Sequence, residues 1–428
     1  MIIKNFKELA TNQEKKDALR IIEAGLEAAL PGDTLRKIVK KDRLVIGKKT
    51  ILLSKYARIF VVGFGKAADS MAKAVFSLAR INGGIIVIPC GTQSVLVNKK
   101  FKILYAGHPV PNKQSVHAGK QIVEFLKNKR PSDFIIFLIS GGGSSLVSLP
   151  DGISLLDKKI TTSLLLKSGA NIQEINCIRK HLSKIKGGKL AESLICDAVS
   201  LVMSDVVGDD LSDIASAPTY FDKTTFKDAD KILTKYGLKK HIPQGVLKRL
   251  DLGIHNKIPE TPKSSKIKNH IIATNNDCLD VMMQRARQLG YTAGIIHSVS
   301  GDVTLVAKNL LQSFPMKKHS CLIFGGEPTV KVIGNGKGGR NQELVLSMFG
   351  KIQNNRKNIV IASCGTDGKD GNTDASGAIM EISKDIHDIR NFLKNNNSYY
   401  FFKKHKGLIF TGPTHTNLMD IGVLLSRQ

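Results

Sequence analysis

Short apolar runs alternate with amphipathic segments along the chain, and this alternation restricts the fold more than any other feature of the sequence. Expected strands at 58–62 and 134–139, both mainly apolar, each lead directly into a glycine-rich turn. Residues 14–30 instead repeat their apolar side chains every three or four positions, which is typical of a helix packed on a core. Strands and helices that alternate in this way form parallel sheets covered by helices. The pattern therefore predicts an α/β fold with Rossmann-like, mostly parallel sheets flanked by helices.

The length of the chain predicts two domains, because 428 residues exceed what one ordinary core supports. Residues 222–268 are polar and lysine-rich with several prolines, which is typical of a boundary or a covering segment. We therefore expect an N-terminal α/β domain at 1–255 and a C-terminal α/β domain at 256–428. The elements expected beyond the boundary include strands at 270–273 and 330–333, a helix at 384–393 and a terminal helix after 411–417.

The chain is strongly basic, with a formal net charge of +28. Lysine is spread along the sequence without an arginine-rich arm, which favours a solvated surface over a nucleic-acid interface. Apolar runs fall well short of the roughly 20 residues that cross a bilayer, and the first residues lack the apolar core of a secretory signal. Six cysteines without a CxxC pair predict reduced, mostly buried thiols. We therefore expect a cytoplasmic protein that binds neither nucleic acid nor membranes.

The first unusual turn follows the strand at 58–62 and reads Gly63-Phe64-Gly65-Lys66. It is similar to a dinucleotide-binding turn, but the acidic residue expected about 20 positions later is missing, and Asn82 lies there instead. A cation at a helix start opposes the helix dipole. Lys66 is therefore either a solvated surface lysine or a cation held over a phosphate or carboxylate.

The second turn, Ser140 to Ser145, carries three glycines between serines at the end of the strand at 134–139. Bare backbone amides of this kind can cradle phosphates, although a tight turn with a serine cap is the plainer alternative. The turn matches neither a Walker A loop nor the nucleophile elbow of hydrolases.

A basic run follows at 176–189, on a helix that we expect to begin with a capping box at Asn171 and Glu174. Gly187 and Gly188 interrupt its helical pattern. The run is either a solvated face or a bend that faces an anion.

Acidic side chains gather after two other strands, at 204–213 and 365–375. Such dense carboxylates favour a metal ion or a general base, with helix capping as the alternative. The second group lacks the glycine and the preceding helix of an EF-hand. A further glycine-rich turn at 334–343 ends on Arg340, a side chain that grips carboxylates and phosphates with two prongs.

Taken together, these clusters resemble the glycerate 2-kinase family, in the class that has a C-terminal MOFRL domain. The stretches follow the order of the family from residue 63 to residue 420, and the combination is far more specific than any one stretch. The matching stretches are GFGKAA, GHPVPN, ISGGGSSL, NCIRKHLSKIKGGKLA, SDVVGDDLSDIASAPT, FGGEPTV, GKGGRNQE, SCGTDGKDGNTDASGA and TGPTHTNLMD.

The resemblance implies two α/β domains with the active site in the cleft between them. It implies phosphorylation of D-glycerate at the 2-hydroxyl, with ATP and Mg²⁺, to give 2-phosphoglycerate and ADP. The active-site lysine of the family corresponds to Lys66 and its active-site arginine to Arg340.

Phosphoryl transfer depends on positioning and charge neutralisation, and the remaining roles are assigned on that basis. Asp205 is the expected general base. The expected magnesium ligands are Asp205, Asp209 and Asp367. The expected ATP contacts are Ser140, Gly141, Gly142, Gly143, Ser144, Ser145, Lys184, Gly187, Gly188, Gly338 and Gly339. The expected D-glycerate contacts are Lys66, Arg179, Arg340 and Asn341. Because neither Lys66 nor Arg340 fills core volume, we expect their replacement by alanine to change folding little.

Two other classes of function stay open at this point. An NAD(P)H-dependent hydroxypyruvate reductase would suit the turn at 63–66 and a glycerate-like substrate, although the missing acid argues against it. A basic binding module without catalysis is the more distant alternative. The sequence also leaves a homodimer open.

Overall fold

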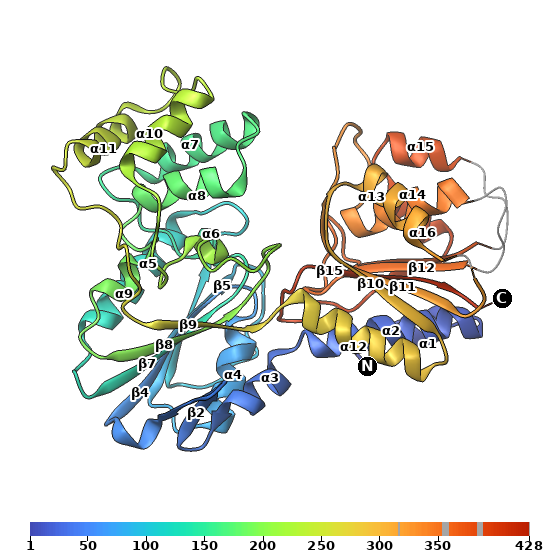
Figure 1. The fold of residues 1–428 in the computed structure, drawn as a ribbon, viewed down its shortest axis with the longest axis horizontal. Coiled ribbons are helices and arrows are strands. Elements are labelled where there is room, and N and C mark those ends of the chain that lie inside the picture. The colour runs from blue at the N-terminus through green and yellow to red at the C-terminus, as the bar shows by residue number, and fades with distance from the viewer. Residues whose placement is uncertain (316, 353–358, 383–387, 428) are drawn as a thin grey trace. The chain divides into compact units, whose positions relative to one another are not determined.

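A computed structural model of the chain describes residues 1–315, 317–352, 359–382 and 388–427. The chain divides into two compact units (Figure 1). The continuous unit is Pro31–Ile272, and the split unit joins Met1–Leu30 to Ala273–Gln428. The division differs from the sequence-based boundary at 255/256 because the first helices pack with the C-terminal elements.

The continuous unit is built on a six-stranded sheet of order β6-β5-β4-β7-β8-β9. The pairs β4–β5, β5–β6, β4–β7 and β7–β8 are parallel, as the sequence predicts. The strands are β4 (Arg58–Phe64), β5 (Gly83–Pro89), β6 (Phe101–Ala106), β7 (Asp133–Ile139), β8 (Asp197–Met203) and β9 (Lys268–Ala273). From β4 the order runs outward to β5 and β6 on one side and to β7 and β8 on the other. Ligands of open α/β sheets bind at such a reversal, outside the carboxyl ends of the strands.

Helices and a small antiparallel sheet complete the continuous unit. Its helices are α3 (Pro31–Ile38), α4 (Ala68–Leu78), α5 (Lys113–Lys127), α6 (Gly143–Leu146), α7 (Leu155–Lys167), α8 (Ile172–His181), α9 (Lys189–Glu192), α10 (Phe226–Lys235) and α11 (Gln244–Ile254). The small sheet is β1 (Val39–Lys40), β2 (Arg43–Ile46) and β3 (Lys49–Leu52), and short 3-10 turns lie at Leu53–Lys55 and Ile214–Ser216.

The polar stretch at 222–268 is a covering segment rather than a boundary. Its helices α10 and α11 are grouped with α7 and α8 in Figure 1. Side chains of this group form a separate apolar core. The strand expected to open a second domain at 270–273 lies in β9, at the edge of the first sheet. The expected start of the second domain is therefore corrected, because pairing with β8 places this strand in the continuous unit.

The split unit is built on a second six-stranded sheet, of order β10-β11-β15-β12-β13-β14. Among the strand pairs that the described residues form here, β10–β11 is parallel and the pairs β11–β15, β12–β15, β12–β13 and β13–β14 are antiparallel. Neighbouring strands in this sheet are therefore not mostly parallel, contrary to the expectation, because β15 inserts between β11 and β12 and is antiparallel to both. Those two strands still run in the same direction. The strands are β10 (Thr292–Asp302), β11 (Ser320–Thr329), β12 (Ile359–Gly365), β13 (Gly377–Glu381), β14 (Leu408–Ile409) and β15 (Asp420–Ser426).

Two groups of helices cover opposite faces of the second sheet in Figure 1. One group is α1 (Phe6–Leu9), α2 (Gln13–Ala28) and α12 (Asn275–Gln288). The other is α13 (Val303–Ser313), α14 (Arg340–Ile352), α15 (Ile389–Lys394) and α16 (Ser398–Lys404). The second group buries an apolar core against the sheet. The α/β class and the two-unit organisation expected from the sequence are thus confirmed.

Three expected elements of the split unit differ. Residues 330–333 form no strand, and Val332 and Ile333 are 75% and 69% exposed. The expected terminal helix is the buried strand β15, because a short apolar run is equally compatible with either element. The helix expected at 384–393 begins outside the described residues, and its described part is α15.

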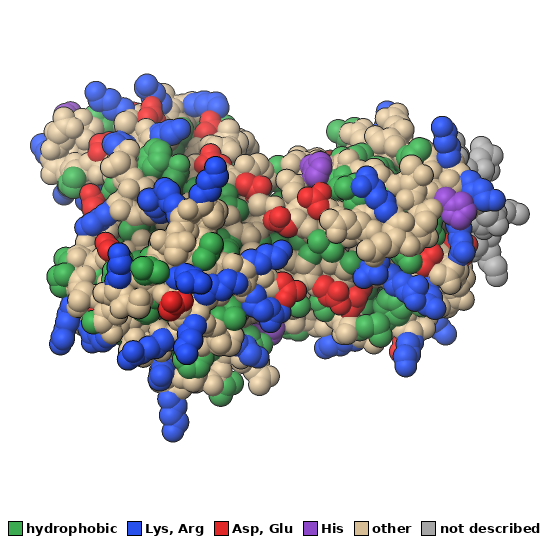
Figure 2. Space-filling model, turned by 60° about the horizontal axis from the view of Figure 1, so that its bottom comes forward, with side chains coloured by type: hydrophobic (Ala, Val, Ile, Leu, Met, Phe, Trp, Pro, Cys, Tyr) green, Lys and Arg blue, Asp and Glu red, His purple; other side chains and the backbone are tan. Residues whose placement is uncertain are grey.

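The net charge of the chain is +28. Figure 2 shows lysine and arginine side chains scattered among acids over the visible faces of both units. All six cysteines are free thiols, and only Cys90 is exposed. In the part of the chain that the structure describes, no helix has the length and apolar character needed to span a bilayer.

Candidate functional site

The switch point of the first sheet holds two interlocked turns. A side chain on Gly65 (φ +132°) would place its Cβ 2.1 Å from Ser140 Oγ, so the two chains approach this closely only with glycine. Ser140 Oγ accepts a hydrogen bond from the amide of Ala67 at 2.9 Å. The amide of Lys66 donates to the carbonyl of Gly141, also at 2.9 Å. The sequence-predicted Lys66 and the 140–145 turn are therefore neighbours.

Gly142 leaves room for two side chains beside this turn. Its backbone is left-handed (φ +80°), and a Cβ there would lie 2.8 Å from the His108 ring and 3.6 Å from Lys66 Cγ. Lys66 is partly exposed and so accessible to a ligand. His108 belongs to the GHPVPN stretch, to which sequence analysis assigned no role, because only the fold brings it to the turn.

Ser144 links the turn to a buried lysine. Lys186 Nζ donates to Ser144 Oγ at 3.0 Å and to the carbonyl of Ala215 at 3.1 Å. Ser144 Oγ also lies 2.9 Å from Ser216 Oγ. Sequence analysis chose Lys184 from the basic run, yet Lys184 is exposed and Lys186 is only 1% exposed. The burial of Lys186 could not be read from the sequence, because it depends on contacts with Ser144 and Ala215. The assignment of Lys184 as an ATP contact stays a prediction.

The two glycines of this bend are held within the protein. Gly187 and Gly188 are left-handed, with φ of +62° and +87°. Their amides donate to the carbonyls of Ser216 at 3.1 Å and Ala217 at 2.7 Å. The glycines therefore shape the basic segment, and their amides already have acceptors. Their assignment as ATP contacts stays a prediction.

Arg179 lies on α8, which begins with the predicted capping box of Asn171 and Glu174. The side chain is partly buried, and it forms no hydrogen bond or ion pair with the residues that the structure describes. Burial lowers the pKa of its guanidinium. The neighbouring Lys180 is instead paired with Asp222, at 3.3 Å.

The acidic segment after β8 contains one carboxylate oxygen without a partner. Asp209 has a left-handed backbone (φ 54°), and its Oδ1 is buried with no hydrogen bond. Asp205 is half-buried at the end of β8. Within the described ranges no group of three or more His, Cys, Asp or Glu side chains is arranged to hold a metal. Mg²⁺ commonly needs fewer, because phosphate oxygens and water complete its shell.

Arg340 begins α14 in the split unit and is held by two carboxylates. Its Nε and Nη2 donate to Asp420 at 2.6 and 3.1 Å, and its Nη1 donates to Glu327 at 2.5 Å. Burial of the guanidinium lowers its pKa, but the carboxylates of Asp420 and Glu327 outweigh burial and raise it.

The pKa shifts of Arg340 and Asp420 have opposite effects on their ion pair. Burial raises the pKa of Asp420 to about 7, against the pull of Arg340. A raised arginine pKa favours the ion pair and a raised aspartate pKa opposes it. The two-pronged contact is the geometry of an ionised pair, so we take Asp420 to be charged. The expectation that replacement of Arg340 changes folding little stays a prediction, and this contact argues against it, because a buried carboxylate depends on the guanidinium.

Asp370 caps α14 beside Arg340. Its carboxylate accepts from the amides of Asn341 at 3.1 Å and Gln342 at 2.9 Å, and from Asn341 Nδ2 at 3.3 Å. Burial raises its pKa against these hydrogen bonds. Asn341 Oδ1 accepts from Ser363 at 2.6 Å, so both ends of the predicted substrate amide are engaged inside the unit. Its contact with D-glycerate stays a prediction.

Gly338 and Gly339 are required by close packing. A Cβ on Gly339 would lie 2.3 Å from Asp370, and one on Gly338 would lie 2.3 Å from Ser398 Oγ. Gly365 is similarly enclosed, since a Cβ there would lie 3.1 Å from Asp367 Oδ1 and 3.4 Å from Asp420 Oδ1. Asp367 therefore lies in the split unit near the Arg340–Asp420 pair, whereas Asp205 and Asp209 lie in the continuous unit.

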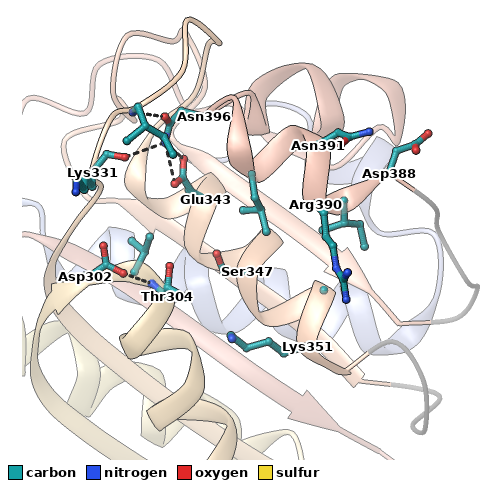
Figure 3. Close-up of a pocket in the computed structure, with 15 residues that line it drawn as sticks. Asp302, Thr304, Lys331, Glu343, Ser347, Lys351, Asp388, Arg390, Asn391 and Asn396 are labelled. Atoms are coloured by element: carbon teal, nitrogen blue, oxygen red, sulfur yellow. Dashed lines mark hydrogen bonds between the residues drawn. The ribbon is translucent and has the colours of Figure 1, made fainter.

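A cavity of about 830 Å³ flanks α14 on the side of α13 and α15 (Figure 3). Its lining includes Asp302, Lys331, Glu343, Lys351 and Arg390. Burial raises the pKa of Glu343, which accepts hydrogen bonds from Asn396 at 3.1 and 3.2 Å. None of the sequence-predicted site residues lines this cavity, so the chemistry expected of Arg340 belongs elsewhere.

Comparisons with known proteins find relatives that match nearly the whole chain. One family model, Domain of unknown function (DUF4147), matches residues 17–251, and the MOFRL family matches residues 320–420. A glycerate 2-kinase of Pyrococcus horikoshii is 38% identical, over 95% of this chain and 96% of the relative. The crystal structure of a glycerate kinase from Thermotoga maritima superposes with a TM-score of 0.80 at 36% identity, over 96% of this chain and 99% of that one. A protein of Agrobacterium vitis named as a hydroxypyruvate reductase is 35% identical, over 86% of this chain and 87% of its own length.

A parallel sheet with two glycine-rich turns at its switch point, followed by a MOFRL unit, defines a two-unit α/β protein of the DUF4147–MOFRL class. The chain belongs to the glycerate 2-kinase family.

Proposed function

We propose that the chain is an ATP-dependent kinase that phosphorylates D-glycerate at its 2-hydroxyl, giving 2-phosphoglycerate and ADP. The observation that carries the proposal is the meeting of Lys66 with the 140–145 turn at the switch point. The likeness to glycerate 2-kinases along nearly the whole chain supports it. A cytoplasmic location and the absence of nucleic-acid partners belong to the same proposal.

Two cations supply the charge that phosphoryl transfer needs. Lys66 is accessible, and its ammonium can bind a phosphate or carboxylate oxygen. Arg340 is already paired, but Glu327 is 46% exposed whereas Asp420 is 5% exposed. Arg340 therefore keeps Asp420 as its orienting partner and exchanges Glu327 for an oxyanion of a reactant.

The acids after β8 fit a magnesium ion, because Asp209 offers a buried carboxylate oxygen without a partner. Asp205 and Asp209 would hold the ion, with Asp367 as the candidate from the split unit. An ion held by these carboxylates would supply positive charge that offsets the charge of the phosphates. Asp205 is also our candidate for the base that accepts the hydroxyl proton of D-glycerate.

The 2-hydroxyl is chosen through the carboxylate of glycerate. The primary hydroxyl at carbon 3 is less hindered, so selection of carbon 2 requires a firm hold on the neighbouring carboxylate. Lys66, Arg179 and Arg340 are cations suited to that hold.

Enolase distinguishes the two products, because it accepts the 2-phosphate and not the 3-phosphate. Purified protein with ATP, Mg²⁺ and D-glycerate should form phosphoenolpyruvate when enolase alone is added. If phosphoenolpyruvate forms only after phosphoglycerate mutase is also added, the product is the 3-phosphate and the assignment to carbon 2 is wrong.

A hydroxypyruvate reductase is the second candidate, favoured by the name of the Agrobacterium relative. A dinucleotide site of this type needs an acid at the end of the strand that follows the glycine turn. That strand is β5, and residues 83–92 contain neither Asp nor Glu. Oxidation of NADH or NADPH with hydroxypyruvate, in the absence of ATP, would favour the reductase.

A further inference from the structure

Three cations lie partly or fully buried around the serine turn, and two of them were not singled out in the sequence. Lys158 on α7 is 4% exposed, and its Nζ donates to Ser148 Oγ at 2.5 Å. Lys186 is 1% exposed, and its Nζ donates to Ser144 Oγ. Ser144 lies four residues before Ser148 in the sequence. Arg179 on α8 is the third. We call Lys158, Arg179 and Lys186 the buried cation cluster.

The cluster has no carboxylate partner among the residues that the structure describes. The acids nearby are engaged elsewhere: Asp222 pairs with Lys180 at 3.3 Å, and Asp213 accepts from Asn176 at 3.0 Å. Burial and the charge of Arg179 lower the pKa of Lys158 to about 7. Burial, together with repulsion from Lys158, Arg179 and Lys180, lowers the pKa of Lys186 well below its usual value. Without an anion, the region is electrostatically unfavourable.

The hydrogen bonds around Lys186 have a fixed direction. Ser216 Oγ donates to Asn176 Oδ1 at 2.9 Å, so the proton between the two serines must come from Ser144. The oxygen of Ser144 then accepts from Lys186. The chain of donors thus runs from Lys186 through Ser144 and Ser216 to Asn176, and it holds the Ser144 side chain of the turn in one orientation.

The backbone beside the cluster is strained. Ala215, Ser216 and Ala217 are all left-handed, with φ of 53°, 58° and 54°. Non-glycine residues rarely adopt this conformation, and a run of three persists only where the surroundings impose it. Here it directs the carbonyl of Ala215 to Lys186 Nζ. Strain of this kind is concentrated at functional sites, which gives a second, independent indication of a site.

We propose that Lys158, Arg179 and Lys186 form a binding site for an oxyanion of a reactant. Building on the proposed kinase function, the oxyanion comes from the triphosphate of the nucleotide or from the carboxylate of D-glycerate. The triphosphate is the better match, because it carries several negative charges and the cluster carries up to three positive ones. The bound anion takes the place of the carboxylate partner that the described residues do not provide.

Replacement of each lysine by methionine tests the site, since methionine keeps much of the side-chain volume and removes the charge. The variants are Lys158→Met and Lys186→Met. Lys159→Met and Lys167→Met are matched controls, because both lysines are exposed and lie on the same helix, α7, as Lys158. Binding of sodium tripolyphosphate and of D-glycerate is measured separately by calorimetric titration, and the melting temperature is measured without ligand.

We expect the dissociation constant for tripolyphosphate to rise at least tenfold in both cluster variants and to stay near the original value in the controls. The ligand-free melting temperature should change little, because methionine keeps much of the buried side-chain volume. A purely structural lysine would show the reverse, a lower melting temperature with unchanged binding. Lys186→Gln, which keeps an N–H donor for Ser144, provides the test if Lys186→Met does not fold.

The outcomes separate the sources of the oxyanion. Weaker binding of tripolyphosphate supports the site with phosphate as the ligand, and weaker binding of D-glycerate alone supports it with carboxylate as the ligand. Unchanged binding of both in folded variants overturns the proposal. Turnover of ATP and D-glycerate by the unaltered protein is measured alongside. Its absence would refute the kinase function without affecting the binding result, and its presence with unchanged binding in the variants would refute the site alone.

Discussion

Replacing Arg340 by alanine should lower the stability of the split unit as well as the activity. The guanidinium holds Asp420 through hydrogen bonds of 2.6 and 3.1 Å, and the Asp420 side chain is only 5% exposed. Alanine would leave that carboxylate buried with its two-pronged partner removed. The carboxylate of Asp370 adds a like charge that also raises the pKa of Asp420.

The magnitude follows from the burial of the pair. Removal of one partner of a buried ion pair costs about 3–5 kcal/mol. Because Arg340 is 33% exposed, we expect the lower end, about 3 kcal/mol. A domain of this size loses roughly 2–4 °C of melting temperature per kcal/mol, so the transition of the split unit should fall by about 6–12 °C.

Scanning calorimetry suits the measurement, because the chain contains no tryptophan for fluorescence. The control is the double variant Arg340→Ala with Asp420→Asn, which removes the stranded charge and should recover part of the loss. If the double variant regains stability and remains inactive, Arg340 acts on the reactants and not only on the fold. A melting temperature for Arg340→Ala within about 1 °C of the unaltered protein would refute the reasoning.

Four further predictions concern single groups. Lys66→Ala should reduce kcat about 100-fold, or about 3 kcal/mol, with an unchanged melting temperature; near-normal kcat would show that the lysine is only solvated. Asp205→Asn should remove most activity, and added Mg²⁺ should restore it if Asp205 is a metal ligand but not if it is the base; full activity would transfer both roles to other acids. Asp370→Ala should destabilise the split unit by about 1–3 kcal/mol, measured by urea denaturation, because the first amides of α14 lose their acceptor. The pKa of Lys158 is lowered from 10.5 to about 7 on folding, so the unfolded chain binds more protons between these values and stability should rise with pH across that window. Lys158→Met should lack this rise in melting temperature, and an identical pH profile in both proteins would contradict the assignment.

Local pattern was enough to predict most of the elements around the site. The strands before both glycine turns and the capping box at Asn171 and Glu174 were confirmed. These features depend on residues close together in the chain, such as an asparagine side chain and an amide three positions later. The prediction of a strand at 330–333 was wrong. Apolar side chains alone do not show whether a segment has a neighbouring strand to pair with.

Sequence patterns could not distinguish the lysines within the basic run for a related reason. Lys184 and Lys186 are two positions apart, and composition gives no ground for preferring either. The left-handed bend at Gly187 and the contacts of Lys186 with Ser144 and Ala215 decide which ammonium is buried. The role of Asp420 was missed in the same way, since it begins a strand that lies next to Arg340 only through pairing with β11 and β12.

The sequence by itself determined the α/β class, the glycine turns at strand ends and the family, because these follow from short-range periodicity and from ordered motifs. Only the tertiary structure decided that the first 30 residues join the C-terminal unit, that β15 separates β11 from β12, and that Asp420 holds Arg340. Burial and strand register decide which residues far apart in the sequence come into contact. These contacts, and their contribution to the free energy of folding, exist only once the chain has packed.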